Sequence, residues 1–248
     1  MAVNKNTITD ADAQRAVALA LEDFYTALLK KIDEVQIRDI MKRKNPYLYR
    51  AKAMQNAAEI VESVLSATVS SSEETIFGNC FFEPLAIFAS GGAKALAPGV
   101  DIMAEDRDAN TVYGIAVKSG PSIYNSSSRS KQDQNFIAAA KLAAQAHAHF
   151  TPVIGYSYGK KKPSRKSSSF CTELAGQRFW EYLTGDPHFY LKIISYMGTK
   201  PEQYVERFRE AYDRASNRLV GQFIADFCNP DGSIDWDRLV RFNSSYED

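Results

Sequence analysis

The sequence has no excess of charge of either sign. Its 248 residues include 30 Lys and Arg and 30 Asp and Glu, so the formal net charge at neutral pH is zero. A protein that attracts polyanions through its overall field carries a positive excess. Any nucleic-acid-binding surface of this chain must therefore come from basic residues that cluster locally.

Cysteine and histidine are also scarce. The three cysteines, Cys80, Cys171 and Cys228, are odd in number and far apart, and they match no metal-binding spacing. His147 and His149 lie two residues apart on an expected helix, where their side chains diverge, and this argues against a zinc site. The N-terminus has no apolar signal region. We therefore expect a reducing, cytoplasmic location.

Long apolar runs and nucleotide-binding loops are missing too. The most apolar helical candidate, residues 136–146, is short and is interrupted by Lys141, so we expect no membrane span. Gly91-Gly92 is not followed by Gly-Lys-Ser or Gly-Lys-Thr, which excludes a Walker loop. With 45% hydrophobic and 24% charged residues, the chain has the composition of an ordinary globular protein.

The most informative stretch is residues 98–121. Two short apolar runs flank a turn rich in Asp and Asn, a pattern that is typical of a β-hairpin. Asp101 enters the hairpin and Lys118 leaves it. In an antiparallel pair, the start of the first strand lies across from the end of the second. We therefore expect Asp101 and Lys118 to meet at one end of the hairpin.

An acid beside a lysine suits the hydrolysis of a phosphodiester. The carboxylate can hold Mg2+, and the cation can act on the attacking water or on the transition-state charge. Residues i and i+2 of a strand share a face, so a second acid is expected at position 116, where this chain has Ala116. An ordinary hairpin with a surface Asp and Lys therefore remains an alternative.

Candidates for the missing carboxylate lie upstream of the hairpin. Residues 70–74 contain overlapping Ser-x-x-Glu capping boxes, which predict that a helix starts there and ends near Gly91. Capping explains Glu73 and Glu74, whereas Glu83 lies in an apolar run and needs a partner if it is buried. We therefore rank Glu83 ahead of Glu74 as a second metal ligand.

The remaining patterns predict a mixed α/β chain. Helical spacing is found in residues 8–33, 34–42, 53–67, 132–150, 173–183, 187–197 and 201–227, and residues 152–158 predict a buried strand. The order strand, helix, strand indicates a right-handed crossover with parallel pairing. We expect a core of helix, antiparallel hairpin, crossover helix and strand, with an N-terminal helical segment (1–69), the core (70–160) and a C-terminal helical subdomain (161–248).

Basic residues cluster in three segments. They alternate with tyrosines in residues 42–52, they end the Ser- and Asn-rich residues 119–131, and they dominate residues 160–166. Such mixtures suit contacts with phosphates and bases, although solvated loops have the same composition. The candidate DNA contacts are Arg43, Lys44, Arg50, Lys52, Ser119, Asn125, Arg129, Lys160, Lys161 and Arg165.

Several of these pieces, in this order, resemble the PmeII family of type II restriction endonucleases. The resemblance spans roughly residues 38–195, and its motifs are those at residues 44–52, 71–78, 99–101, 117–121 and 125–127. It implies a PD-(D/E)XK nuclease core, Mg2+ with Mn2+ as a substitute, and double-stranded DNA cut at a short sequence. Asp101 would then bind the metal and Lys118 would orient or activate water. The resemblance also implies a homodimer and a cognate DNA methyltransferase as genetic partner. The alternative is a catalytically silent DNA-binding protein with the same fold.

Overall fold

The chain folds into two units in the computed structural model, which describes residues 2–161 and 170–246. One unit comprises Met1–Phe24 and Phe77–Lys200, and the other comprises Tyr25–Ile76 and Pro201–Asp248. We call them the sheet unit and the helical unit. Each combines segments that lie far apart in the sequence, whereas the sequence suggested the consecutive segments 1–69, 70–160 and 161–248.

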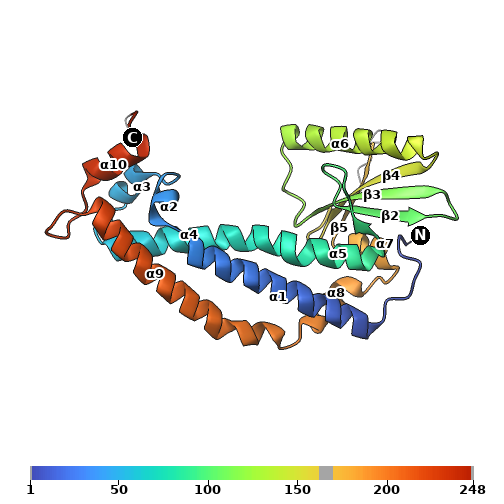
Figure 1. Cartoon of the computed structure of the whole chain (residues 1–248), viewed down its shortest axis with the longest axis horizontal. Coiled ribbons are helices and arrows are strands. Elements are labelled where there is room, and N and C mark those ends of the chain that lie inside the picture. The colour runs from blue at the N-terminus through green and yellow to red at the C-terminus, as the bar shows by residue number, and fades with distance from the viewer. Residues whose placement is uncertain (1, 162–169, 247–248) are drawn as a thin grey trace. The chain divides into compact units, whose positions relative to one another are not determined.

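The sheet unit is built on a five-stranded sheet in the order β1-β2-β3-β4-β5 (Figure 1). The strands are β1 (Ala93–Lys94), β2 (Ile102–Asp106), β3 (Thr111–Lys118), β4 (His149–Tyr156) and β5 (Thr172–Ala175). β2 pairs with β1 and β3 in antiparallel fashion, and β3, β4 and β5 are parallel. Helix α6 (Ser126–Gln145) connects β3 to β4. The predicted hairpin and crossover are thus confirmed.

Helices pack on both faces of this sheet because the side chains of each buried strand alternate. On β4, Ile154 and Tyr156 form one core cluster with Phe136 of α6. Gly155 faces the other way, toward Phe179 of α7 (Gln177–Thr184). Helix α5 (Glu83–Ser90) contacts β1, β2 and β3, and it also packs on α7.

Gly155 permits the close approach of α7 to the sheet. A Cβ at this position would lie 2.0 Å from the ring of Phe179, which is fully buried. We expect Gly155→Ala to lower the free energy of unfolding by about 1–3 kcal/mol through overpacking, as measured by denaturant titration. Gly221→Ala on α9 (Val205–Phe227) is the control, because among the described residues no atom lies within 4 Å of its Cβ. An unchanged midpoint for Gly155→Ala would contradict this packing.

The helical unit brings an early segment of the chain together with the C-terminal residues. It contains the second part of α1 (Asp10–Glu34), most of α4 (Ala57–Phe77), and α2 (Ile37–Met41), α3 (Pro46–Ala51), α9 and α10 (Trp236–Ser244). The Arg218 guanidinium donates to the carbonyls of Ile32 and Val35, and the Ile37 amide donates to Gln222. Leu239 of α10 is fully buried, so the C-terminal residues belong to this core.

The predicted helix start at residues 70–74 is wrong. Helix α4 runs through these residues and continues into a π-helical turn, η1 (Gly78–Phe82), and then α5. The hydroxyl of Ser72 donates to the carbonyl of Thr68 at 2.8 Å, and that of Thr68 donates to Val64 at 2.6 Å. Hydroxyls that bond back along the helix do not cap a new one. Glu73 and Glu74 therefore lie inside a helix.

Two other expected boundaries differ from the structure. Helix α6 begins at Ser126 and not at position 132, because Asn125 and Ser128 form a capping box. The helix expected at residues 173–183 is instead strand β5 followed by α7, and Gly176, with φ of 54°, separates the two. The helices expected nearer the C-terminus are present as α8 (Phe189–Met197), the 3-10 turn η2 (Lys200–Tyr204) and α9.

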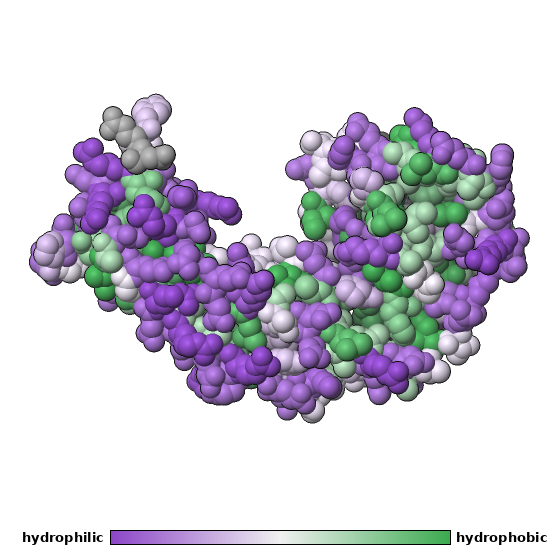
Figure 2. Space-filling view, in the orientation of Figure 1, coloured by the Kyte–Doolittle hydropathy of each residue, from purple (hydrophilic) through white to green (hydrophobic). Residues whose placement is uncertain are grey.

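The face of the molecule seen in Figure 2 is largely hydrophilic. Figure 2 shows hydrophilic residues over much of the visible face of each unit, interrupted by apolar patches on the sheet unit. None of the helices in the described part of the chain is both long and apolar enough to cross a membrane.

Candidate active site

Asp101 and Lys118 meet at one end of the hairpin, as the sequence predicts. Asp101 directly precedes β2, and its Oδ2 accepts a hydrogen bond from the amide of Val117 at 2.7 Å. The Nζ of Lys118 lies 3.2 Å from the same Oδ2 and 2.9 Å from the carbonyl oxygen of Val117. Both side chains are 24% exposed. One ammonium thus sits between two oxygens of the kinds that Mg2+ accepts.

Glu83 reaches this end of the hairpin from the start of α5. The preceding π-helical turn contacts the residue after β3, since a Cβ at Gly78 would lie 2.5 Å from Ser119 Oγ. The Oε1 of Glu83 is 2.9 Å from Lys94 Nζ on β1. The pKa of Lys94 is raised by this hydrogen bond, by the charge of Glu83 and, further, by the charge of Asp101. Lys94 therefore lies within electrostatic reach of both carboxylates.

Position 116 supplies no oxygen to the site. Ala116 is fully buried in the cluster under α6, beside Phe136 and Ile154. In the described part of the chain, no group of three or more His, Cys, Asp or Glu side chains could hold a metal. Asp101 and Glu83 still fit Mg2+, which commonly takes one or two carboxylates and completes its shell with water and substrate phosphate. Glu74, the other candidate, is an exposed residue of the helical unit.

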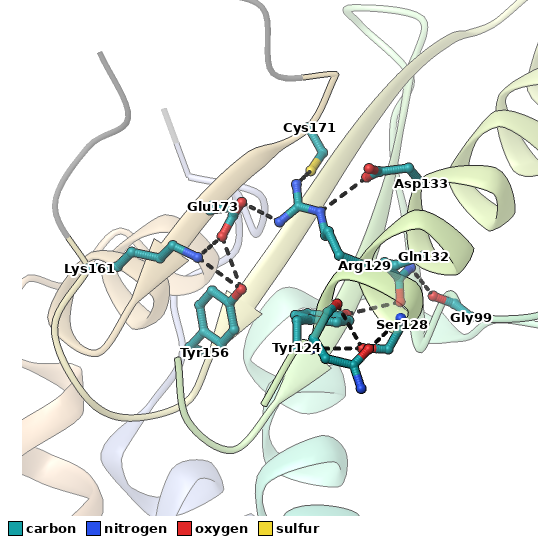
Figure 3. Close-up of polar contacts among 11 residues, drawn as sticks. Gly99, Tyr124, Ser128, Arg129, Gln132, Asp133, Tyr156, Lys161, Cys171 and Glu173 are labelled. Carbon is teal, nitrogen blue, oxygen red and sulfur yellow. Dashed lines mark hydrogen bonds and ion pairs between the residues drawn. The ribbon is translucent and has the colours of Figure 1, made fainter. Parts of the chain in front are cut away.

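A second polar cluster lies at the ends of β4 and β5, on the α6 face of the sheet (Figure 3). The strand register pairs Glu173 with Ile154, whose side chain packs under α6. The carboxylate of Glu173 accepts hydrogen bonds from Arg129, Lys161 and the hydroxyl of Tyr156, the last at 2.9 Å. Tyr156 is the last residue of β4 and Lys161 follows it, so the cluster includes the carboxyl end of a parallel strand, where open α/β sheets bind ligands.

Arg129 anchors this cluster to α6. Its Nε lies 3.3 Å from Asp133 and its Nη2 lies 3.1 Å from Cys171 Sγ. Burial tends to lower the pKa of Arg129, but the hydrogen bond and charge of Glu173 raise it overall. Burial likewise tends to raise the pKa of Glu173, but hydrogen bonds from Lys161, Arg129 and Tyr156 hold it below its ordinary value. Both groups are therefore charged at neutral pH.

Tyr124 lies between the two clusters. Its hydroxyl donates to Gln132 at 3.0 Å, and the Gln132 amide donates to the carbonyl of Gly99 at 2.6 Å. Burial is the largest influence raising the pKa of Tyr124, and the charges of Tyr156 and Asp101 add to it. Tyr124, whose ring also lies beside Arg129 and Tyr156, thus links the two clusters, and we call the two clusters together the polar face.

A family model for the type II restriction endonuclease EcoO109I matches residues 11–204, most of the chain and all of the polar face just described. The chain belongs to this family. The match agrees with the class of type II restriction endonuclease expected from the sequence, while the finer resemblance to the PmeII family is not confirmed. A direct comparison with curated proteins gives no match.

The residues predicted to contact DNA occur in both units of this EcoO109I-family chain. The sheet unit carries Ser119, Asn125, Arg129, Lys160 and Lys161, and the helical unit carries Arg43, Lys44, Arg50 and Lys52. Arg165 lies outside the described residues. Some of these residues have structural partners: Asn125 caps α6, and the Arg50 guanidinium lies 5.5 Å from the ring centroid of Trp236.

The sequence pattern does not point to Tyr156 and Glu173 as site residues. Glu173 is followed by Leu174 and Ala175, which favour a helix locally, so the short strand is hidden. Gly176 was the available signal of a break between strand and helix. Tyr156 was a possible candidate because its side chain carries a hydroxyl near the carboxyl end of a predicted parallel strand.

Proposed function

We propose that this chain hydrolyses phosphodiester bonds of double-stranded DNA in a Mg2+-dependent reaction, as a type II restriction enzyme with a PD-(D/E)XK-like core. Membership of the EcoO109I family supports a restriction nuclease. The observation that carries the assignment of the site is the ammonium of Lys118, held 3.2 Å from Asp101 Oδ2 and 2.9 Å from the Val117 carbonyl. This arrangement marks a cation position at the end of the hairpin.

The side chains around that position have separable roles. Asp101 and Glu83 would hold the metal, together with the carbonyl oxygen of Val117. Asp101 and the Val117 carbonyl already face the ammonium group of Lys118, and Glu83 faces that of Lys94. Mg2+, when bound, supplies a Lewis acid for the scissile phosphate and lowers the pKa of its water. Lys118 would donate hydrogen bonds to the attacking water or to a phosphate oxygen and so stabilise the developing negative charge.

The same proposal includes an assembly and a genetic partner. A two-fold symmetric dimer would present one active site to each strand of a palindromic sequence. A sedimentation experiment that finds only a monomer, with and without cognate duplex, would contradict the dimer.

A cognate DNA methyltransferase would protect the host DNA, so methylated DNA should resist cleavage by this protein.

The test is cleavage of supercoiled plasmid by the purified protein. In the presence of Mg2+ we expect discrete DNA fragments whose ends all lie at one short sequence. With EDTA we expect no cleavage.

Ala116 favours a second candidate, a catalytically silent DNA-binding protein. That protein would retard a duplex in a gel without cutting it in Mg2+ or Mn2+. A protein that neither binds nor cuts DNA would refute both functions.

A further inference from the structure

Arg129 and Lys161 are two cations held together by one carboxylate (Figure 3). One oxygen of Glu173 accepts from Arg129, and the other accepts from Lys161 and from the hydroxyl of Tyr156. Arg129 and Lys161 come from different elements and repel each other, and the carboxylate between them offsets this repulsion. A phosphodiester also presents two oxygens that share one negative charge, and it binds Arg and Lys in the same charge-assisted manner.

Both cations keep donors available to a ligand. A guanidinium and an ammonium group carry more N–H donors than their contacts within residues 2–161 and 170–246 use. The side chains of Arg129 and Lys161 are 26% and 34% exposed. A solvent-borne anion can therefore reach the pair.

With Glu173 ionised and paired with both cations, the cluster attracts other anions only weakly. Arg129 and Lys161 are matched by Glu173 and by Asp133, so the four side chains are neutral together. A neutral cluster contributes little to the general attraction between a protein and DNA. Removing the charge of Glu173 would leave one uncompensated positive charge in this cluster.

We propose that Arg129 and Lys161 form a binding site for a backbone phosphate of DNA, and that Glu173 occupies this site in the free protein as a resident anion. The site rests on the proposed function and deepens it, because contacts through Tyr124 and Gln132 link it to Gly99, two residues before Asp101. An incoming phosphodiester competes with Glu173 for the two cations. The carboxylate of Glu173 therefore lowers the affinity for DNA. A phosphate displaces it only when the protein also holds the DNA through other contacts.

The test is the DNA affinity of Glu173→Gln, which removes the charge and keeps the size of the side chain. Affinity is measured by the fluorescence anisotropy of a labelled mixed-sequence duplex with EDTA, over a series of salt concentrations. We expect the variant to bind several-fold more tightly than the wild type. The slope of log affinity against log salt should change little, because the same phosphate contact forms in both proteins and only its competitor is removed.

Two comparisons separate this site from a general charge effect. Glu181→Gln makes the same charge change at an exposed position of α7 and should leave affinity nearly unchanged. The gain should also vanish when Arg129→Gln and Lys161→Gln are added to Glu173→Gln. An equal gain for Glu181→Gln, or a gain that survives loss of both cations, would overturn the proposal. So would a Glu173→Gln protein that binds inorganic phosphate but gains no affinity for duplex.

The remaining outcomes distinguish this site from the proposed function. If folded Glu173→Gln binds duplex no better than a wild type that cuts plasmid, Glu173 is only a structural partner and the nuclease function stands. If the wild type binds no duplex, both proposals fail. Should Glu173→Gln not fold, Lys161→Gln gives an independent measure, because losing one phosphate contact should flatten the salt slope by about 0.9. An unchanged slope would then overturn the proposal.

Discussion

Lys118→Ala and Asp101→Asn are each expected to abolish plasmid cleavage while the affinity for duplex DNA stays within a few fold of the wild type. Both side chains act at the scissile phosphate, whereas affinity comes from many contacts with the DNA backbone. Removing one preorganised donor from a transition-state charge typically costs about 10²–10³ in kcat. Asp101→Asn also removes the negative charge that favours a metal ion.

Single-turnover cleavage with Mg2+ measures the first effect, and anisotropy with EDTA measures the second. Lys141→Ala is the matched control, because it removes the same charge from an exposed position on α6 and should cut at the wild-type rate. A Lys118→Ala or Asp101→Asn protein that cuts as fast as the wild type would show that the hairpin is not the active site. Loss of DNA affinity together with cleavage would instead point to a folding defect.

The central part of the site follows from the sequence because it depends on local rules. Two short apolar runs joined by an Asp- and Asn-rich turn predict a hairpin, and antiparallel pairing then brings Asp101 and Lys118 together. The crossover to β4 follows from the order of the elements. The capping motif at residues 70–74 misled because a Ser hydroxyl can equally bond back inside a continuous helix, as Ser72 does.

The Glu173 cluster could not be predicted because its members meet through tertiary packing. Arg129 comes from α6, Tyr156 from β4 and Glu173 from β5, and the parallel register that aligns them leaves no local signal. Pairing with β4 overrides the helical preference of the residues around Glu173. The grouping into two units has the same origin, since contacts such as Ile37 with Gln222 join distant segments.

The place of Ala116 explains why the second acid must come from another element. Its side chain lies fully buried beside Phe136 and Ile154 under α6. A carboxylate at this position would be desolvated among apolar groups, at a cost that only a close partner could offset. Glu83 avoids this cost because α5 brings it to the partly exposed end of the hairpin, where it meets Lys94.

The ion pair between Glu83 and Lys94 gives a test of this assignment that does not depend on loss of activity. If Glu83 is a metal ligand, Lys94 competes with the metal for its carboxylate. Lys94→Met should then lower the Mg2+ concentration that gives half-maximal cleavage. If the pair only joins α5 to β1, the substitution should reduce stability and leave the Mg2+ dependence unchanged.

Glu83→Gln is expected to lower cleavage by at least about a hundredfold, at the upper end of the 10–100-fold effects seen for residues that support a metal. Asp101 would remain as the one carboxylate, so metal affinity falls, and part of the activity should return at high Mg2+ or with Mn2+. Cleavage is measured over a titration of each metal, with Glu74→Gln as the control with the same charge change. If Glu83→Gln cuts normally while Glu74→Gln is inactive, Glu74 is the ligand. If both variants cut normally, Asp101 is the only protein carboxylate on the metal.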